Sequence, residues 1–144
     1  MAYIITINNN VFKIAANENE KNDLNTFFPP AEAINISDAD FLKIKKNKTV
    51  ATISGNTVSF TDVSNSFESE ENLKNYINNL KELITAFLNP NTNNNNKILY
   101  STINSYYNTL DNFDTSTITF PLNKSWEEYC EENSITYIHS LQIP

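Results

Sequence analysis

Four glutamates close together near the C-terminal end of the chain are the densest group of side chains that could do chemistry. Glu127, Glu128, Glu131 and Glu132 contain two like-charged pairs four residues apart, which a helix brings onto one face. Carboxylates so placed could bind a hard cation or act as a general acid and base. A solvated helix face, whose first turn favours acidic residues, is the simpler interpretation. We favour it because the sequence lacks the loop spacing and central glycine of a calcium hand.

Cys130 and His139 are the only cysteine and the only histidine, and together they could act as a nucleophile and its base. Nothing in the sequence brings the two side chains into contact. A thiolate next to apolar Tyr129 and near four glutamates is disfavoured, which predicts a buried packing cysteine. One cysteine and one histidine are also too few soft ligands for a structural zinc site. We therefore predict no catalytic residue, no metal and no cofactor.

The composition excludes further classes of function. The one glycine, Gly55, cannot supply a glycine-rich phosphate loop, and every cation is a lysine because arginine is absent. The net charge of −7, from 10 basic and 17 acidic residues, repels nucleic acid. No apolar run is long enough to cross a membrane, and the first ten residues do not resemble a secretory signal. We expect synthesis in the cytoplasm and neither a nucleic-acid nor a membrane partner.

A basic patch consists of Lys43, Lys45, Lys46 and Lys48. It could contact an acidic partner surface, but lysines at the end of a helix also suit the carbonyl end of its dipole. We favour the helix-end interpretation.

Large apolar side chains are the candidates for contact with a partner, because such residues dominate binding hot spots. The candidate interface residues are Phe27, Phe28, Pro29, Pro30, Trp126, Tyr137, Leu141 and Ile143. Core packing explains Trp126 and the segment 27–30 equally well. The apolar tail 141–144 indicates that the C-terminal end is docked, since termini usually fray.

The N-terminal half has the period of β-structure. Residues 3–7 and 11–14, with three asparagines between them, predict a hairpin, and residues 33–36 predict a short strand. Residues 17–30 are expected to form a loop anchored by its aromatic residues and prolines. Ser37 is expected to cap a short helix that ends near residue 46. Residues 49–54 and 57–61 predict a second hairpin, with Gly55 in the turn and an apolar face of Ile53, Val58 and Phe60.

The middle of the chain changes to the period of a helix. Two series of apolar residues share one spacing: Leu73, Ile77, Leu80, Ile84 and Phe87, then Leu99, Ile103, Tyr106, Leu110 and Phe113. With Pro90 and an asparagine tract between them, they predict an antiparallel helical hairpin. Tyr76, Leu83 and Tyr107 widen the apolar stripe, so the hairpin is expected to pack also on the sheet or on another subunit.

The C-terminal part is expected to be strand, helix and strand. Residues 117–120 and 135–138 predict the strands, and Asn123 or Ser125 is expected to cap a short helix through residue 130. The fold class is therefore α+β, in which a small antiparallel sheet of β-hairpins packs with a long helical hairpin and a short C-terminal helix. We expect a single domain over 1–144, mostly β with one short helix in 1–63, a helical hairpin in 66–114, and strand, helix, strand and a docked tail in 115–144.

Both ends and part of the middle of the chain resemble small, mostly uncharacterised virion structural proteins of marine tailed bacteriophages. The resemblance lies in Met1-Ala2-Tyr3-Ile4, the run from Asn8 to Asn17, Ser37-Asp38-Ala39-Asp40-Phe41, and the ending from Ser125-Trp126-Glu127-Glu128-Tyr129-Cys130 to Leu141-Gln142-Ile143-Pro144. The excess of Asn, Lys, Ile and Tyr is also similar to that of an AT-rich phage genome.

The resemblance implies a non-enzymatic component of the virion, most simply a capsid decoration or cement protein or another head or tail accessory. Its partners would be capsid or tail proteins, with homo-oligomers on the particle and synthesis in the host cytoplasm. A phage assembly chaperone or an inhibitor of a host protein, absent from the virion, is the alternative. A small hydrolase or metal-dependent enzyme using the glutamate cluster is a third hypothesis.

Overall fold

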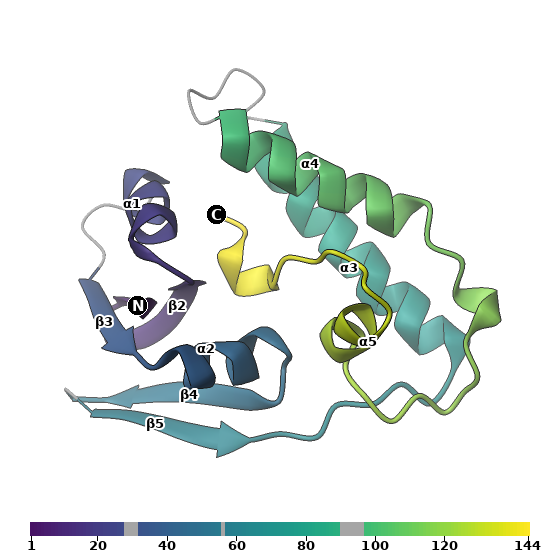
Figure 1. The fold of residues 1–144 in the computed structure, drawn as a ribbon, viewed down its shortest axis with the longest axis horizontal. Helices are drawn as coiled ribbons and strands as arrows, with labels where there is room; N and C mark the ends of the chain where they lie inside the picture. The colour runs from purple at the N-terminus through teal and green to yellow at the C-terminus, as the bar shows by residue number, and fades with distance from the viewer. Residues whose placement is uncertain (28–31, 56, 90–96) are drawn as a thin grey trace. The chain divides into compact units, whose positions relative to one another are not determined.

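The computed structural model describes residues 1–27, 32–55, 57–89 and 97–144, and within them the fold is α+β, as predicted (Figure 1). Contacts divide the chain into two compact units: unit 1 is Met1–Ser64 with Pro144, and unit 2 is Asn65–Ile143. This boundary coincides with the predicted change from mostly β to helical structure between residues 63 and 66. Folding as a single domain stays a prediction.

Unit 1 begins with a three-stranded antiparallel sheet in the order β2–β1–β3. Its strands are β1 (Ala2–Ile7), β2 (Asn10–Ala15) and β3 (Glu32–Ile36). Asn8 and Asn9 form the turn of the first hairpin with φ angles of 53° and 62°, the left-handed geometry that asparagine tolerates. The first hairpin and the strand at 33–36 are therefore confirmed. Ile4 and Ile5 of the central strand are both buried, although successive residues point to opposite faces.

Helix α1 (Glu18–Phe27) occupies most of the segment predicted as a loop, so that prediction was wrong. A reciprocal cap starts the helix. The Glu20 N–H donates to the Asn17 side-chain oxygen at 3.0 Å, and the Glu20 carboxylate accepts the Ala16 N–H at 2.6 Å. Unit 1 thus contains two helices where one short helix was expected.

A buried leucine packs α1 on the sheet. Leu24 packs with Ile5 and Ala15, and the half-buried ring of Tyr3 lies against this cluster. Within Glu18–Phe27 only Leu24 and Phe27 are apolar, and two apolar residues within a single turn are too few to establish a helical period. Residues 17–23 are all polar or charged and resemble a loop.

Helix α2 (Asp38–Lys45) begins as predicted, because the Ser37 hydroxyl accepts the Asp40 N–H at 3.0 Å. The second hairpin, of β4 (Thr49–Ser54) and β5 (Thr57–Asp62), is also confirmed. Gly55 in its turn has a φ of 60°.

The register of the second hairpin fixes which side chains share a face. Ile53 pairs with Val58, and Ala51 pairs with Phe60. Ala51 is buried and Ile53 and Val58 are half-buried, whereas Phe60 is 38% exposed. The predicted apolar face therefore forms, with Phe60 at its accessible end.

Unit 2 is built on the predicted helical hairpin of α3 (Glu70–Leu88) and α4 (Lys97–Asp111), which lie side by side (Figure 1). The helices are antiparallel, because Glu70 at the start of α3 accepts a hydrogen bond at 3.0 Å from Thr115, which follows the end of α4. The Lys81 ammonium of α3 also contacts the Asp111 carboxylate of α4 at 2.8 Å. Buried side chains from the two predicted apolar series are Leu73, Ile77, Leu80, Ile84, Phe87, Ile103, Tyr106 and Leu110. None of the described helices combines the length and apolar character that crossing a bilayer requires.

Helix α5 (Trp126–Glu132) completes unit 2 and is capped by Ser125, whose hydroxyl accepts the Glu128 N–H at 3.0 Å. The sequence left Asn123 and Ser125 open as caps, and the structure selects Ser125. Two short 3-10 helices flank α5: η1 (Thr115–Thr117) and η2 (Ser140–Gln142).

The two strands predicted beside α5 were wrong, since 117–120 and 135–138, all within the described residues, form none. Alternation is nonetheless present: Ile118 and Phe120 are half-buried between exposed neighbours, and Tyr137 is buried next to exposed Thr136. One-sided packing produces the same alternation as a strand, so the pattern alone could not establish strand pairing.

Candidate functional site

Helix α5 carries most of the side chains that could do chemistry, and Trp126 fixes its first turn. The Trp126 side chain is 0% exposed, and its indole N–H donates to the Tyr106 hydroxyl of α4 at 2.9 Å. Its ring lies edge-on to Phe113 at a centroid distance of 4.8 Å. Burial raises the pKa of Tyr106, so its hydroxyl stays protonated. Trp126 thus anchors α5 on α4.

The acidic cluster was interpreted as a solvated helix face, and for Glu127 this was wrong. The Glu127 side chain is buried, with 1% of its surface exposed. The Tyr76 hydroxyl of α3 donates to Glu127 Oε1 at 2.5 Å, and the Tyr76 ring lies edge-on to Phe67 at 5.5 Å. A carboxylate removed from water requires such a donor. Glu127 therefore joins α5 to α3 through a polar contact inside unit 2.

Two other glutamates of the cluster have different partners. Glu131 and Glu132 are exposed: Glu131 accepts the Tyr137 hydroxyl at 2.9 Å, and Glu132 forms an ion pair with Lys124. Burial and the neighbouring Glu131 raise the pKa of Tyr137. Among the described residues, no three His, Cys, Asp or Glu side chains are grouped so that they could hold a metal ion.

Cys130 is buried on the same helix, as predicted for a packing cysteine. Burial and, to a smaller extent, the negative charge of Glu127 raise the pKa of its thiol. The thiolate that a nucleophile requires is therefore disfavoured in the folded chain.

His139 has a structural role in the 3-10 helix that follows. Its Nδ1 accepts the Leu141 N–H at 3.0 Å, while its own backbone N–H donates to Gln142 Oε1 at 3.1 Å. This reciprocal pair caps η2, and the side chain is 4% exposed. The ring nitrogen that could accept a proton from a nucleophile is thus bonded to the backbone.

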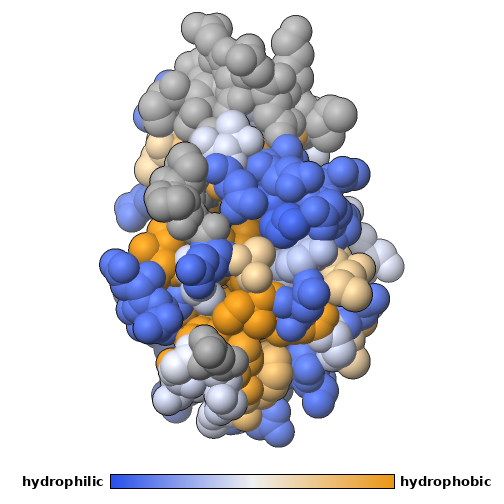
Figure 2. All heavy atoms as spheres, turned by 90° about the vertical axis from the view of Figure 1, so that its left-hand side faces the viewer, coloured by the Kyte–Doolittle hydropathy of each residue, from blue (hydrophilic) through white to orange (hydrophobic). Residues whose placement is uncertain are grey.

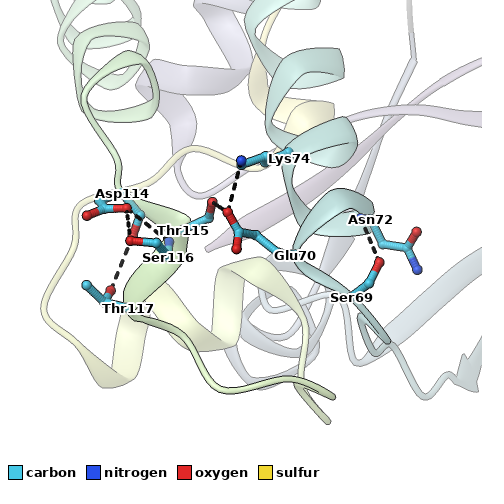
Figure 3. Close-up of polar contacts among 8 residues, drawn as sticks. All are labelled: Ser69, Glu70, Asn72, Lys74, Asp114, Thr115, Ser116 and Thr117. Atoms are coloured by element: carbon cyan, nitrogen blue, oxygen red, sulfur yellow. Dashed lines mark hydrogen bonds and ion pairs between the residues drawn. The ribbon is translucent and has the colours of Figure 1, made fainter.

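A second polar cluster lies where α3 begins and η1 follows α4 (Figure 3). Glu70 accepts hydrogen bonds from the Lys74 ammonium at 2.9 Å and from the Thr115 hydroxyl at 3.0 Å. These two hydrogen bonds lower the pKa of Glu70, and the bond from Lys74 has the larger effect. The contact between Glu70 and Thr115 closes the base of the helical hairpin.

Side-chain caps flank this cluster on both elements (Figure 3). The Ser69 hydroxyl accepts the Asn72 N–H at 3.3 Å at the start of α3. Asp114 accepts the Ser116 hydroxyl at 2.6 Å and the Ser116 N–H at 3.0 Å, and these bonds lower the pKa of Asp114. Both groups therefore act as N-caps, Ser69 for α3 and Asp114 for η1.

The basic patch lies at the end of α2, as the helix-end interpretation predicted. Lys43 and Lys45 belong to the last turn of the helix, and Lys46 is its C-cap. Lys43 and Lys48 are exposed, whereas Lys45 and Lys46 are half-buried. Contact of this patch with an acidic partner stays a prediction.

The candidate interface residues divide into core residues and residues that the structure does not describe. Trp126, Tyr137 and Ile143 are buried and Leu141 is half-buried, and for Trp126 this favours the core-packing alternative. Phe28, Pro29 and Pro30 lie outside the described residues. Phe27 ends α1, and its side chain lies outside the description.

The sequence did not reveal the partners of the buried polar groups. Tyr76 was recognised only as a fringe of the apolar stripe, and Tyr106 only as part of it, although both use their hydroxyls to bind α5. The residue type alone could have indicated these contacts, since the hydroxyl of a buried tyrosine usually has a hydrogen-bond partner. Helix α5 thereby covers part of the stripe that looked too wide for a hairpin alone.

No family model matches this chain, and no curated protein or solved structure matches it either.

Proposed function

We propose that this protein is a non-enzymatic virion component, a capsid decoration or cement protein or another head or tail accessory, which binds assembled capsid or tail proteins. The observation that carries the proposal is an asymmetry in exposed apolar side chains. Among the described side chains, the most exposed large apolar ones all belong to residues 1–63: Met1, Ile7, Leu42, Val50, Phe60 and Val63. Unit 2 contributes none to this group.

Isolated exposed apolar residues are common, but their concentration in one unit is typical of a contact surface. On the face drawn in Figure 2, apolar residues lie exposed between hydrophilic ones. A lattice presents many copies of one partner surface, so a small apolar contact is sufficient if it is repeated. Shape and apolar contact are therefore the means of binding that we propose.

The groups that could do chemistry support the same proposal. Cys130 is a buried thiol, His139 caps a 3-10 helix, and Glu127 accepts a hydrogen bond inside unit 2. Each is engaged in an interaction that stabilises the fold. The resemblance to virion proteins of marine tailed phages supplies the class of partner.

Two measurements test the proposal. Mass spectrometry of purified particles of the encoding phage should detect the chain, and the purified chain should cosediment with particles that lack it. Detection in infected cells but not in particles would overturn the proposal and favour a chaperone or an inhibitor.

Variants can locate the contact. Leu42→Lys combined with Val50→Lys places charges on two of the most exposed apolar positions, at 48% and 49% exposure, and should weaken cosedimentation at least about tenfold. Asn79→Lys on exposed α3 adds the same kind of charge to unit 2 and should bind like the wild type. Equal binding by all variants would refute the assignment to unit 1.

A further inference from the structure

Strand β5 ends its sheet with a free edge. In the described part of the chain its only ladder partner is β4, and every residue of β5 is exposed except half-buried Val58. The strand reads Thr-Val-Ser-Phe-Thr-Asp, so it carries neither the lysine nor the proline that usually protects an edge against pairing.

The ladder determines which backbone groups face that edge. The Val63 N–H donates to the Lys48 carbonyl at 2.9 Å, which makes these two residues a hydrogen-bonded pair. Bonded and non-bonded pairs alternate in an antiparallel ladder. In the register of β4 and β5, Asp62, Phe60 and Val58 therefore belong to non-bonded pairs. The backbone N–H and C=O groups of these three residues point away from β4, towards the free edge.

We propose that a second copy of this chain pairs with that edge, β5 against β5 in antiparallel orientation, to form a continuous four-stranded sheet. Only outward-facing residues can bond across the new ladder. One register alone pairs all three of them: Phe60 opposite Phe60 of the copy, and Val58 opposite Asp62 in both directions. A two-fold axis then passes between the two Phe60 residues, as a closed dimer requires.

The side chains are compatible with this register. Phe60, which is 38% exposed, meets its own copy, and cross-strand aromatic pairs stabilise sheets. Asp62, the one charge on the strand, lies opposite Val58, and its carboxylate accepts the Thr49 hydroxyl at 2.8 Å. The two Asp62 residues are offset by four positions, about 13 Å, beyond the screening length of about 10 Å at 0.1 M salt.

This pairing is independent of the virion proposal, since it requires no particle. Sedimentation velocity over a concentration series should show the mass rising from 16.4 kDa towards twice that value. A monomer at every concentration up to about 1 mM overturns the pairing.

Charge substitutions at the axis test the geometry. Phe60→Lys and Phe60→Glu each place like charges opposite one another, so each variant alone should dissociate at least about tenfold more readily. An equimolar mixture of the two should dimerise again, because opposite charges then meet. Val50→Lys is the matched control, because Val50 lies on the opposite face of the sheet from Phe60. This variant should dimerise like the wild type. Dimers of Phe60→Lys as tight as the wild type refute the register.

Cysteine substitutions provide a second test that does not depend on charge. Paired residues in a bonded pair have Cα atoms about 5.5 Å apart, within disulfide range, so Phe60→Cys should cross-link to itself under oxidation. Val58→Cys lies on the same strand and face but opposite Asp62, and should not cross-link. Equal cross-linking of both variants contradicts the proposed register.

Discussion

Burial within unit 2 controls the chemistry of the Cys130 thiol. Because burial raises its pKa, we expect a disulfide reagent to label Cys130 at neutral pH at least about a hundredfold more slowly in the native protein than in urea. The release of the coloured thiolate measures both rates. Asn79→Cys adds an exposed thiol on α3 as the control, and that thiol should react rapidly. Rapid labelling of native Cys130 contradicts the prediction.

The hydrogen bond from Tyr76 to Glu127 should contribute measurably to stability. Tyr76→Phe removes the donor but keeps the ring, and we expect the free energy of unfolding to fall by about 1.5–3 kcal/mol, the range for a bond to a charged group. Urea denaturation measures the change. Tyr107→Phe is the control, because Tyr107 is half-buried on α4 and its ring lies beside the Lys81 ammonium. This substitution should lower the free energy of unfolding much less. Equal losses would show that the carboxylate does not depend on Tyr76.

At the scale of secondary-structure elements, the contacts of Glu70 should make the start of α3 sensitive to acid. Its pKa is lowered from an ordinary value of 4.5 by the bonds from Lys74 and Thr115. Stability from this group is therefore present above that value and is lost as the pH falls through the lowered folded pKa. Glu70→Gln should lose less stability on acidification than the wild type. The midpoints of urea denaturation, measured from pH 6 down to about pH 3, test this expectation. Glu71 is exposed, so Glu71→Gln is the control and should behave like the wild type.

Elements with a strong period could be predicted from the sequence, and those without one could not. Helices α3 and α4 and both hairpins repeat apolar residues at helical or strand spacing over several turns or pairs. Helix α1 has only two apolar residues, Leu24 and Phe27, within one turn, which is too few to establish a period. The hydrogen-bond partners of the α5 residues could not be predicted for another reason. Tyr76 and Glu127 are 51 positions apart in the sequence and come into contact only when the helices pack.

At the scale of the whole chain, the two units use their apolar residues differently. Unit 2 buries its apolar series between α3 and α4 and forms hydrogen bonds between its buried polar groups through α5. Unit 1 exposes large apolar side chains from Met1 to Val63. A net charge of −7 opposes non-specific association of such chains by mutual repulsion. In our proposal, unit 1 binds its partner through these apolar side chains.

A substitution in unit 1 tests whether the chain folds as one domain. Unit 1 has about 64 residues, and a chain that short buries only about 60% of its surface and is marginal alone, so we expect both units to unfold together. Ile5→Ala, at a position with 0% exposure, should cost about 2–5 kcal/mol. The only tryptophan, Trp126, belongs to unit 2, so its fluorescence should report an earlier urea transition in this variant.

The neighbouring variant Ile7→Ala is the matched control, because Ile7 ends the same strand at 37% exposure and its loss should shift the transition much less. Hydrogen exchange of the β1 amides would verify that Ile5→Ala has weakened unit 1. If those amides lose protection while the Trp126 transition keeps its midpoint, the units are two independent domains. A common shift of both signals means that the marginal core of unit 1 is stable only as part of the whole chain.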